Sequence, residues 1–231
     1  MSEAKLDCME VYTRREVASA AVMLHGLGAS ANDLSLIVKH LQRARELGLH
    51  YLAPNAPIRA ITVNKGRVTR AWYDVFGDPN EVPQDREGVL ASAKQLSALL
   101  DHERQKGIPT QRTILGGFSQ GATMALHVGL RYPYRLAGIV ALSGELVLPE
   151  DLERGRHPAN AQTPILMVHG TADPVVPIEA AEDSRDRLRS MGYAVHWHTL
   201  PVDHAVSLEE VEIVDRWMYA VLTGNSLRAD Q

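Results

Sequence analysis

The pattern G-x-S-x-G occurs near the middle of the chain, as Gly117-Phe118-Ser119-Gln120-Gly121. The apolar run 112–116 precedes it and the alanine- and leucine-rich stretch 122–130 follows it, as expected for a strand, a tight turn and a helix. A serine on such a turn is held with its hydroxyl exposed at the end of a sheet, and the flanking positions have room only for small residues. The pattern alone is common, but in this setting it predicts that Ser119 is a nucleophile.

A serine hydroxyl is a poor nucleophile at neutral pH, so it requires a base and an acid that orients the base. Asp173 follows the apolar run 165–169, and His204 follows the run 194–200. Both partners are therefore present in the order serine, acid, histidine. Because the carboxyl ends of parallel strands lie at one edge of a sheet, we expect the three side chains to meet there. Ser119, Asp173 and His204 are predicted to form a catalytic triad.

A glycine-rich loop, His25-Gly26-Leu27-Gly28-Ala29-Ser30, follows the first strongly apolar run. Its glycines allow the backbone to approach a substrate, so the amides of Leu27 and of Gln120, directly after the serine, are the predicted donors of an oxyanion hole. The loop also fits the G-x-G-x-x-G/A pattern of dinucleotide-binding proteins. That pattern requires an acid at the end of the next strand, where the sequence has Pro54-Asn55-Ala56-Pro57 instead. The nucleotide-binding interpretation is therefore disfavoured.

The remaining histidines and the one cysteine give no sign of a metal site. His25 and His169 each end an apolar run just before a glycine and are expected to hold loop backbone in place. His196 and His198 share one face of a strand, but no third ligand stands nearby at a familiar spacing, so packing or surface roles are favoured. A lone Cys8 excludes an internal disulfide and indicates a reducing, cytoplasmic location. No metal or organic cofactor is expected.

Short apolar runs alternate with longer amphipathic segments along the chain, which is typical of βα units and a mostly parallel sheet covered on both faces. Strands are expected over 18–25, 50–53, 112–116, 136–143, 165–169 and 194–200. Helices are expected over 30–46, 86–106, 122–130, 178–191 and 207–222. The irregular segments 54–85 and 144–164 indicate binding loops, and 5–15 could supply only a short hairpin. Residues 1–231 are predicted to form one α/β domain.

Composition excludes several classes of protein. Of the 231 residues, 45% are hydrophobic and 23% are charged, so a disordered chain is excluded. The formal net charge of −4 argues against nucleic-acid binding. The first residues contain no basic and apolar leader, and the apolar runs are far shorter than the ~20 residues of a membrane span, so neither a secretory signal nor a span is expected.

Several motifs, taken together and in order, resemble one family. They are His-Gly-Leu-Gly-Ala-Ser at 25–30, Ala-Pro-Ile-Arg at 56–59, Ala-Trp-Tyr-Asp at 71–74, Gly-Gly-Phe-Ser-Gln-Gly-Ala at 116–122, His-Gly-Thr-Ala-Asp-Pro-Val-Val-Pro at 169–177 and Asp-His at 203–204. This set closely resembles the phospholipase/carboxylesterase family, which includes acyl-protein thioesterases. The resemblance implies an α/β-hydrolase fold without a large cap domain and hydrolysis of carboxylic esters or thioesters without a cofactor.

The resemblance assigns the same roles to Ser119, His204 and Asp173, and to the amides of Leu27 and Gln120. In that family the segment after the strand that ends here at Ser143 forms a hydrophobic flap over the acyl group. Leu146, Leu148 and Trp72 are therefore candidates for an acyl channel, the alternative being that the two leucines only seal the edge of the core. The family commonly has glycines where this chain has Ala122 and Asp203. A carboxylate at 203 would disfavour anionic, phospholipid-type substrates.

We expect a hydrolase that cleaves small-molecule esters of short to medium acyl chains through an acyl-enzyme. Acyl-protein thioesterase or lysophospholipase-type activity on the same machinery is the alternative, and a catalytically silent binding protein of the same fold is less favoured. Apolar residues around the flap could pair two subunits, so a homodimer is a further expectation.

Overall fold

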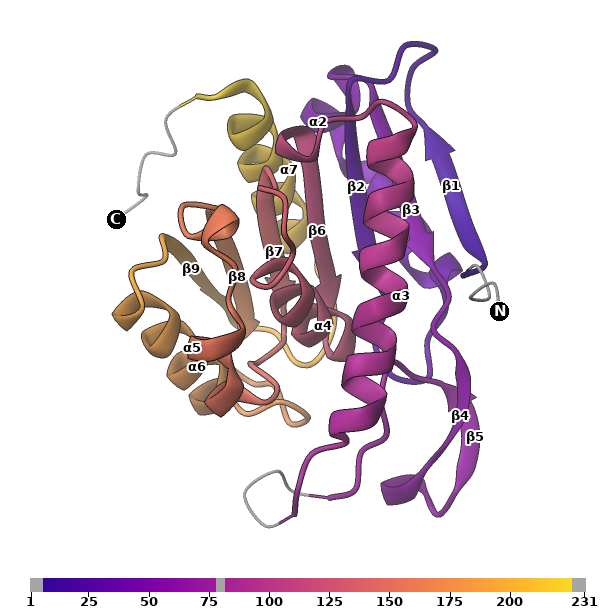
Figure 1. Cartoon of the computed structure of the whole chain (residues 1–231), viewed down its shortest axis with the longest axis vertical. Helices are drawn as coiled ribbons and strands as arrows, with labels where there is room; N and C mark the ends of the chain where they lie inside the picture. Colours follow the sequence, from indigo (N-terminus) through magenta and orange to yellow (C-terminus); the bar gives the residue numbers. More distant parts are fainter. Residues whose placement is uncertain (1–5, 78–81, 226–231) are drawn as a thin grey trace.

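The computed structural model describes residues 6–77 and 82–225. Within this part of the chain, seven strands form a sheet in the order β1-β3-β2-β6-β7-β8-β9 (Figure 1). β1 is antiparallel to β3, and every other neighbouring pair is parallel. The strands are β1 (Cys8–Tyr12), β2 (Ser19–Leu24), β3 (Leu49–Pro54), β6 (Thr113–Phe118), β7 (Gly138–Leu142), β8 (Ile165–Gly170) and β9 (Val195–Leu200).

Helices cover both faces of this sheet (Figure 1). One hydrophobic core lies between the sheet and α3, α4 and α6, and a second lies between the sheet and α1, α2 and α7. Every residue of β2, β3, β7 and β8 is buried, which explains why these strands are continuous apolar runs. The fold is that of an α/β-hydrolase, as predicted. The helices are α1 (Ser35–His40), α2 (Gln42–Glu46), α3 (Arg86–Gln105), α4 (Gln120–Gly129), α5 (Leu152–Gly155), α6 (Ile178–Ser190) and α7 (Leu208–Thr223).

The prediction of one helix over 30–46 is wrong. The segment contains a 3₁₀ turn, η1 (Ala31–Leu34), followed by α1 and α2, which are separated at Leu41 with ψ of 68°. The carboxylate of Asp215, on α7, accepts hydrogen bonds from the backbone N–H groups of Arg43 (3.0 Å) and Ala44 (2.9 Å). Because a side chain from a distant helix caps α2, two short helices replace the continuous one that the periodicity favours.

The segment 54–85 is more regular than expected. It contains a hairpin of β4 (Ile58–Ile61) and β5 (Arg67–Arg70), joined through η2 (Thr62–Asn64). Lys65 and Gly66 close the hairpin with φ of 56° and 76°. The amide N–H of Gly28 donates to the carbonyl oxygen of Arg70 at 2.9 Å, so the hairpin is fixed against the loop that follows β2.

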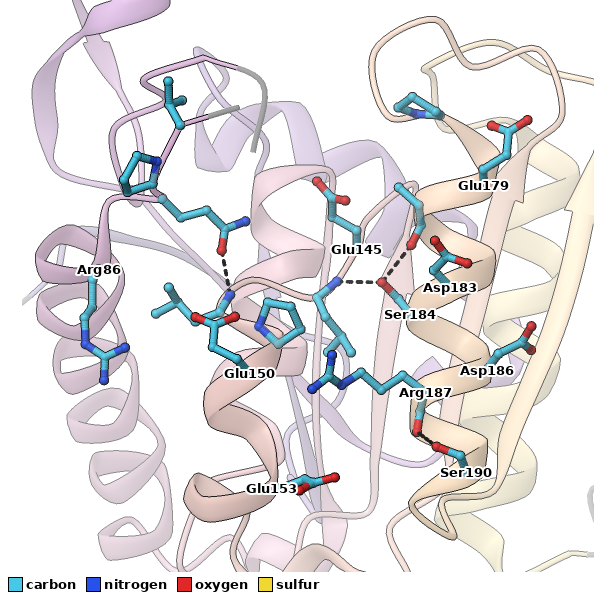
Figure 2. Close-up of a pocket in the computed structure, with 18 residues that line it drawn as sticks. Arg86, Glu145, Glu150, Glu153, Glu179, Asp183, Ser184, Asp186, Arg187 and Ser190 are labelled. Atoms are coloured by element: carbon cyan, nitrogen blue, oxygen red, sulfur yellow. Dashed lines mark hydrogen bonds between the residues drawn. The ribbon is translucent and has the colours of Figure 1, made fainter. Parts of the chain in front are cut away.

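The segment 144–164 lies between α3 and α6, as Figure 2 shows, and contains only short helical pieces. These are η4 (Pro149–Asp151), α5 and η5 (Pro158–Asn160). Its first part is fixed from both sides, because Leu148 N–H donates to Gln84 Oε1 (2.7 Å) and Leu146 N–H donates to Ser184 Oγ (2.9 Å).

None of the helices described here combines the length and the apolar character that crossing a bilayer would require.

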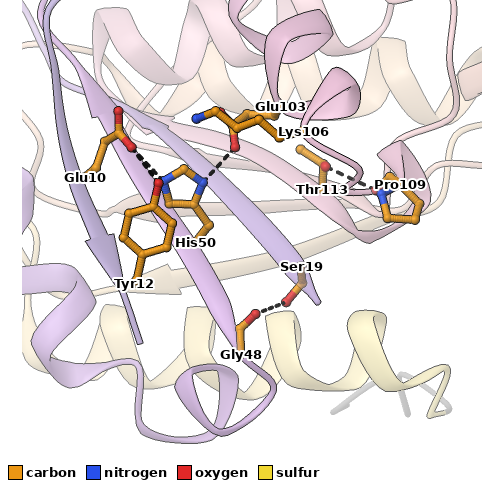
Figure 3. Close-up of polar contacts among 9 residues, drawn as sticks. All are labelled: Glu10, Tyr12, Ser19, Gly48, His50, Glu103, Lys106, Pro109 and Thr113. Atoms are coloured by element: carbon orange, nitrogen blue, oxygen red, sulfur yellow. Dashed lines mark hydrogen bonds and ion pairs between the residues drawn. The ribbon is translucent and has the colours of Figure 1, made fainter. Parts of the chain in front are cut away.

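Residues 8–12, for which the sequence suggested at most a hairpin, form the edge strand β1, and a buried ionic cluster ties this strand to α3 (Figure 3). The two ring nitrogens of His50, on β3, lie 2.7 Å from Glu103 Oε2 and 3.0 Å from Glu10 Oε2. Lys106 Nζ donates to the other oxygen of Glu103 at 2.8 Å, and the Tyr12 ring stacks on the imidazole.

Glu103 is completely buried, so its charge depends on these partners. Burial by itself raises the pKa of this carboxyl, but the hydrogen bonds from His50 and Lys106 outweigh it and hold the pKa below its usual range. The cluster therefore keeps an ionised carboxylate inside the protein.

We expect His50→Leu to lower the free energy of unfolding by about 3–5 kcal/mol, because it removes one of the two side chains that hydrogen-bond to the buried Glu103 carboxylate and leaves only Lys106 among the described residues. Urea denaturation at neutral pH measures this loss. The double variant His50→Leu/Glu103→Leu should lose less than the single variant, since no charge then remains buried. A double variant at least as unstable as the single one would show that the histidine matters only for packing.

The side chain of Ser207 caps the N-terminus of α7. Ser207 Oγ accepts a hydrogen bond from the amide N–H of Glu210 at 3.1 Å. The Glu210 side chain is 2% exposed, and its Oε2 has no hydrogen-bond partner among the described residues. Burial raises the pKa of this carboxyl to about 7, with the backbone contact at Ser207 opposing the shift.

Stability should therefore fall as the pH rises from about 4.5 to about 7, because the unfolded chain releases the Glu210 proton in this range while the folded protein retains it. The whole change amounts to about 3 kcal/mol. Glu210→Gln should remove this component, so that the variant exceeds the parent protein in stability at pH 8 but not at pH 4. Thermal unfolding across this range tests the expectation, and parallel profiles for the two proteins would contradict it.

Candidate active site

Ser119 occupies the turn between β6 and α4, with φ of 55° and ψ of −125°. L-residues rarely adopt this conformation, which costs about 1–3 kcal/mol. Two backbone hydrogen bonds hold it: Ser119 N–H donates to the Leu142 carbonyl (2.8 Å), and Thr123 N–H donates to the Ser119 carbonyl (3.1 Å). The strained turn directs the serine side chain away from the sheet.

The glycines that flank this turn leave no room for a side chain, as predicted. A Cβ atom on Gly121 would overlap the carbonyl oxygen of Leu24, and one on Gly117 would overlap the backbone of Gly121. The end of β2 and the first turn of α4 can approach each other only because both positions lack a side chain.

The structure brings together the three side chains that the sequence singled out. His204 Nε2 lies 2.9 Å from Ser119 Oγ, and His204 Nδ1 lies 2.7 Å from Asp173 Oδ2. The three residues follow β6, β8 and β9, so their strands deliver them to one edge of the sheet. The Phe118 ring packs beside the imidazole, with 4.7 Å between ring centroids.

Asp173 is held rigidly. Its side chain is inaccessible to solvent, and its Oδ1 accepts hydrogen bonds from the amides of Val175 (2.8 Å) and Val176 (2.9 Å). Burial raises the pKa of this carboxyl, but the hydrogen bonds from His204 and from these amides outweigh it and hold the pKa below its usual range. Asp173 is therefore an ionised partner for His204, whereas the neighbouring Asp203 is exposed.

Two further histidines hold loop backbone, which confirms the role predicted for them. The Ala56 amide donates to Nε2 of His25 at 3.0 Å, which leaves the other ring nitrogen, 2.7 Å from the Gly26 carbonyl oxygen, as a donor. His169 Nε2 lies 2.9 Å from the carbonyl oxygen of Val176. Within the described ranges, no group of three or more His, Cys, Asp or Glu side chains is placed to hold a metal ion.

Ser119 lies in a cavity of about 540 Å³, here called the serine cavity. Leu27 and Gln120 line the same cavity. Gln120 is the first residue of α4, so its N–H has no acceptor within the helix and is available to a ligand. The loop around Leu27 is shaped by Gly28, which has φ of 78°.

The side chain of Gln120 has a role that the sequence did not suggest. Its Oε1 accepts a hydrogen bond from the Trp72 amide (2.8 Å), and its Nε2 donates to the Tyr73 carbonyl (2.9 Å). The residue that follows the serine thus fixes the backbone of the loop that forms one wall of the serine cavity. No sequence pattern could reveal this, because the partners are 47 and 48 residues away.

The structure does not place Trp72, Leu146 or Leu148 in the serine cavity. Trp72 is completely buried, and its indole N–H donates to the His25 carbonyl at 2.9 Å, so it is a core residue beneath the site. Leu146 and Leu148 are nearly buried and line a neighbouring groove. The structure thus places Trp72 outside the serine cavity and the two leucines in the adjoining groove, and the role of these residues in an acyl channel stays a prediction. The apolar lining of the cavity includes Val63, Val75, Phe76, Val82, Val175 and Val176.

Replacing Gln120 by alanine retains the backbone N–H but leaves the buried amide of Trp72 without an acceptor. We expect a loss of about 1–3 kcal/mol in unfolding free energy and a higher KM, because the cavity wall is no longer fixed. Chemical denaturation and steady-state kinetics with a chromogenic ester measure the two effects. Gln95→Ala, on α3 and outside the serine cavity and the neighbouring groove, is the matched control; equal stability of the two variants would refute this role.

Comparison with known proteins shows the family to which the chain belongs. The family model described as Phospholipase/Carboxylesterase matches residues 6–222. Acyl-protein thioesterase 1 of Gibberella zeae is 32% identical over 94% of this chain and 97% of its own, and that of Schizosaccharomyces pombe is 37% identical over 75% and 77%. The crystal structure of Zea mays acyl-protein thioesterase 2 superposes with a TM-score of 0.83 at 30% identity, covering 94% of this chain and 99% of that one. The chain belongs to the phospholipase/carboxylesterase family of α/β-hydrolases and is a hydrolase.

Proposed function

We propose that Ser119, His204 and Asp173 are the catalytic triad of this hydrolase and that it cleaves acyl thioesters and esters through an acyl-enzyme. The observation that carries the proposal is the hydrogen-bonded series from Ser119 Oγ to Nε2 and Nδ1 of His204 and on to Asp173. Each contact has the length and the order that proton transfer from the hydroxyl to the imidazole requires.

In the first half of the reaction, Ser119 Oγ attacks the acyl carbonyl carbon while its proton moves to His204 Nε2. The amides of Leu27 and Gln120 donate to the oxyanion that develops on the carbonyl oxygen. The tetrahedral intermediate then breaks its bond to the leaving sulfur or oxygen, which takes the proton from His204. The acyl group remains on Ser119.

In the second half, water gives a proton to His204 and attacks the acyl-enzyme, which releases the carboxylic acid and restores the serine hydroxyl. Asp173 stabilises the imidazolium that forms in each half. Because this carboxylate stays ionised and receives three hydrogen bonds, it can hold the imidazole in one orientation without taking up its proton.

For the substrate, the curated relatives favour acyl-protein thioesters over small esters, since the relatives compared above carry that name. The apolar side chains around Ser119 are suited to a short or medium acyl chain. The same machinery would also cleave small esters, because both substrates pass through the same tetrahedral intermediate.

Ser119→Ala should reduce kcat for both thioesters and esters by several orders of magnitude, since no other group can form the acyl-enzyme. The variant should keep its fold and lose labelling by a fluorophosphonate probe that reacts with activated serines. Ser97→Ala, on α3 and outside the serine cavity, should retain both turnover and labelling.

Substantial turnover by Ser119→Ala would exclude this nucleophile. If the parent protein neither turns over esters or thioesters nor reacts with the probe, the site is a binding site on an inactive hydrolase fold instead.

A further inference from the structure

A groove of about 1,150 Å³ adjoins the serine cavity. Segments 82–86 and 145–153 line it together with the exposed face of α6 (Figure 2). The groove and the serine cavity share six lining residues, so a molecule bound at Ser119 can extend directly into the groove. These are Val82, Pro83, Gln84, Glu145, Pro177 and Ala180.

The lining of this groove is strongly acidic, and we call it the acidic groove. Two arginines, Arg86 and Arg187, are its basic residues, and Arg86 already forms an ion pair with Asp151. Six carboxylates face them, of which Asp186 is paired with Arg185. These carboxylates are Glu145, Glu150, Glu153, Glu179, Asp183 and Asp186.

Four of the carboxylates have no ion pair or hydrogen bond from a side chain within the described part of the protein. Glu179 and Asp183 are one helical turn apart on α6, and Glu150 and Glu153 face them from the opposite wall. All four residues are exposed. The two walls thus present four carboxylates toward the same space, into which the side chain of Arg187 also extends (Figure 2).

The groove exists without any rearrangement. The side chains of Gln84 and Ser184, one from each side of the groove, accept hydrogen bonds from the backbone N–H groups of Leu148 and Leu146. These hydrogen bonds fix the floor on which a ligand would lie. A preformed site spends less binding free energy on ordering its own residues. The α6 wall from Glu179 to Ser190 is about 16 Å long, which matches about five residues of extended peptide.

The charge of the walls identifies which part of a substrate the groove can hold. An acyl chain is apolar, so it gains nothing from walls of hydrated carboxylates and is better placed among the valines around Ser119. The leaving group is the other part of the substrate, and a cationic one would find unpaired carboxylates on both sides.

We propose that the acidic groove binds a basic peptide segment beside the acylated residue, so that the substrates are acylated proteins in which lysines or arginines flank the acylation site. This proposal rests on the function proposed above, and it adds a specificity that is set by α6 and by segment 150–153.

The test uses two synthetic peptides with the same acyl-cysteine and the same chain length. One peptide has four Lys or Arg residues beside the cysteine, and the other has Gln at those positions. We expect kcat/KM at low salt to be roughly tenfold higher for the basic peptide, as a few exposed ion pairs provide, with most of the difference in KM. The preference should shrink when the ionic strength rises above 0.5 M, because salt screens exposed charges.

The double variant Glu179→Gln/Asp183→Asn should reduce the ratio of kcat/KM for the basic peptide to kcat/KM for the neutral peptide toward one. The double variant Glu150→Gln/Glu153→Gln, on the opposite wall, provides an independent second test. Glu182→Gln is the matched control: it removes one charge from α6 at a position outside the groove lining, so the ratio should stay as in the parent protein. Circular dichroism checks that each variant is folded.

Equal rates for the two peptides in the parent protein, or a preference that survives in both double variants, would overturn the proposal. A small neutral ester, assayed in parallel, separates the two levels of failure. If this ester is hydrolysed but charge has no effect, only the acidic groove is refuted; if neither the ester nor the peptides are hydrolysed, the proposed function itself fails.

Discussion

The backbone contact between the end of β2 and the first turn of α4 is the constraint on which the site depends. Gly121 lies against the carbonyl of Leu24, and any side chain there would push the helix away from the sheet. The same approach sets the strained backbone of Ser119 and brings its hydroxyl to His204. It also brings the loop containing Leu27 to the serine. The close packing of β2 against α4 therefore positions both the Ser119 hydroxyl and the loop that contains Leu27.

Buried polar side chains hold the loops that this packing brings together. The His25 ring accepts a hydrogen bond from the amide of Ala56, and the indole of Trp72 donates to the carbonyl of His25. The Gln120 side chain hydrogen-bonds to the backbone of Trp72 and Tyr73. Each of these groups would be costly to bury alone, so each is satisfied by a loop backbone group. Side chains from the end of β2 and from α4 thereby hold a cavity wall that is made of irregular chain.

The sequence was most informative where local pattern and burial coincide. Continuous apolar runs predicted the parallel strands, and strand ends followed by Ser119, Asp173 and His204 predicted that these side chains meet. Prediction failed where distant residues decide the outcome. The expected helix is interrupted at Leu41 because Asp215, on α7, accepts hydrogen bonds from the amides of Arg43 and Ala44 at the start of the second short helix. The apolar cavity wall also depends on how the β4–β5 hairpin folds back, which periodicity does not encode.

The cap that Asp215 places on α2 has a consequence for how the protein is made. Arg43 and Ala44 leave the ribosome long before the aspartate that completes their helix, which follows 171 residues after Ala44. The two amides must stay hydrated, or bind other groups, until Asp215 has been synthesised. The N-terminal helical layer can thus reach its final form only once the last helix has been synthesised, and a ribosome that stops before residue 215 releases a chain whose first helices lack that closure.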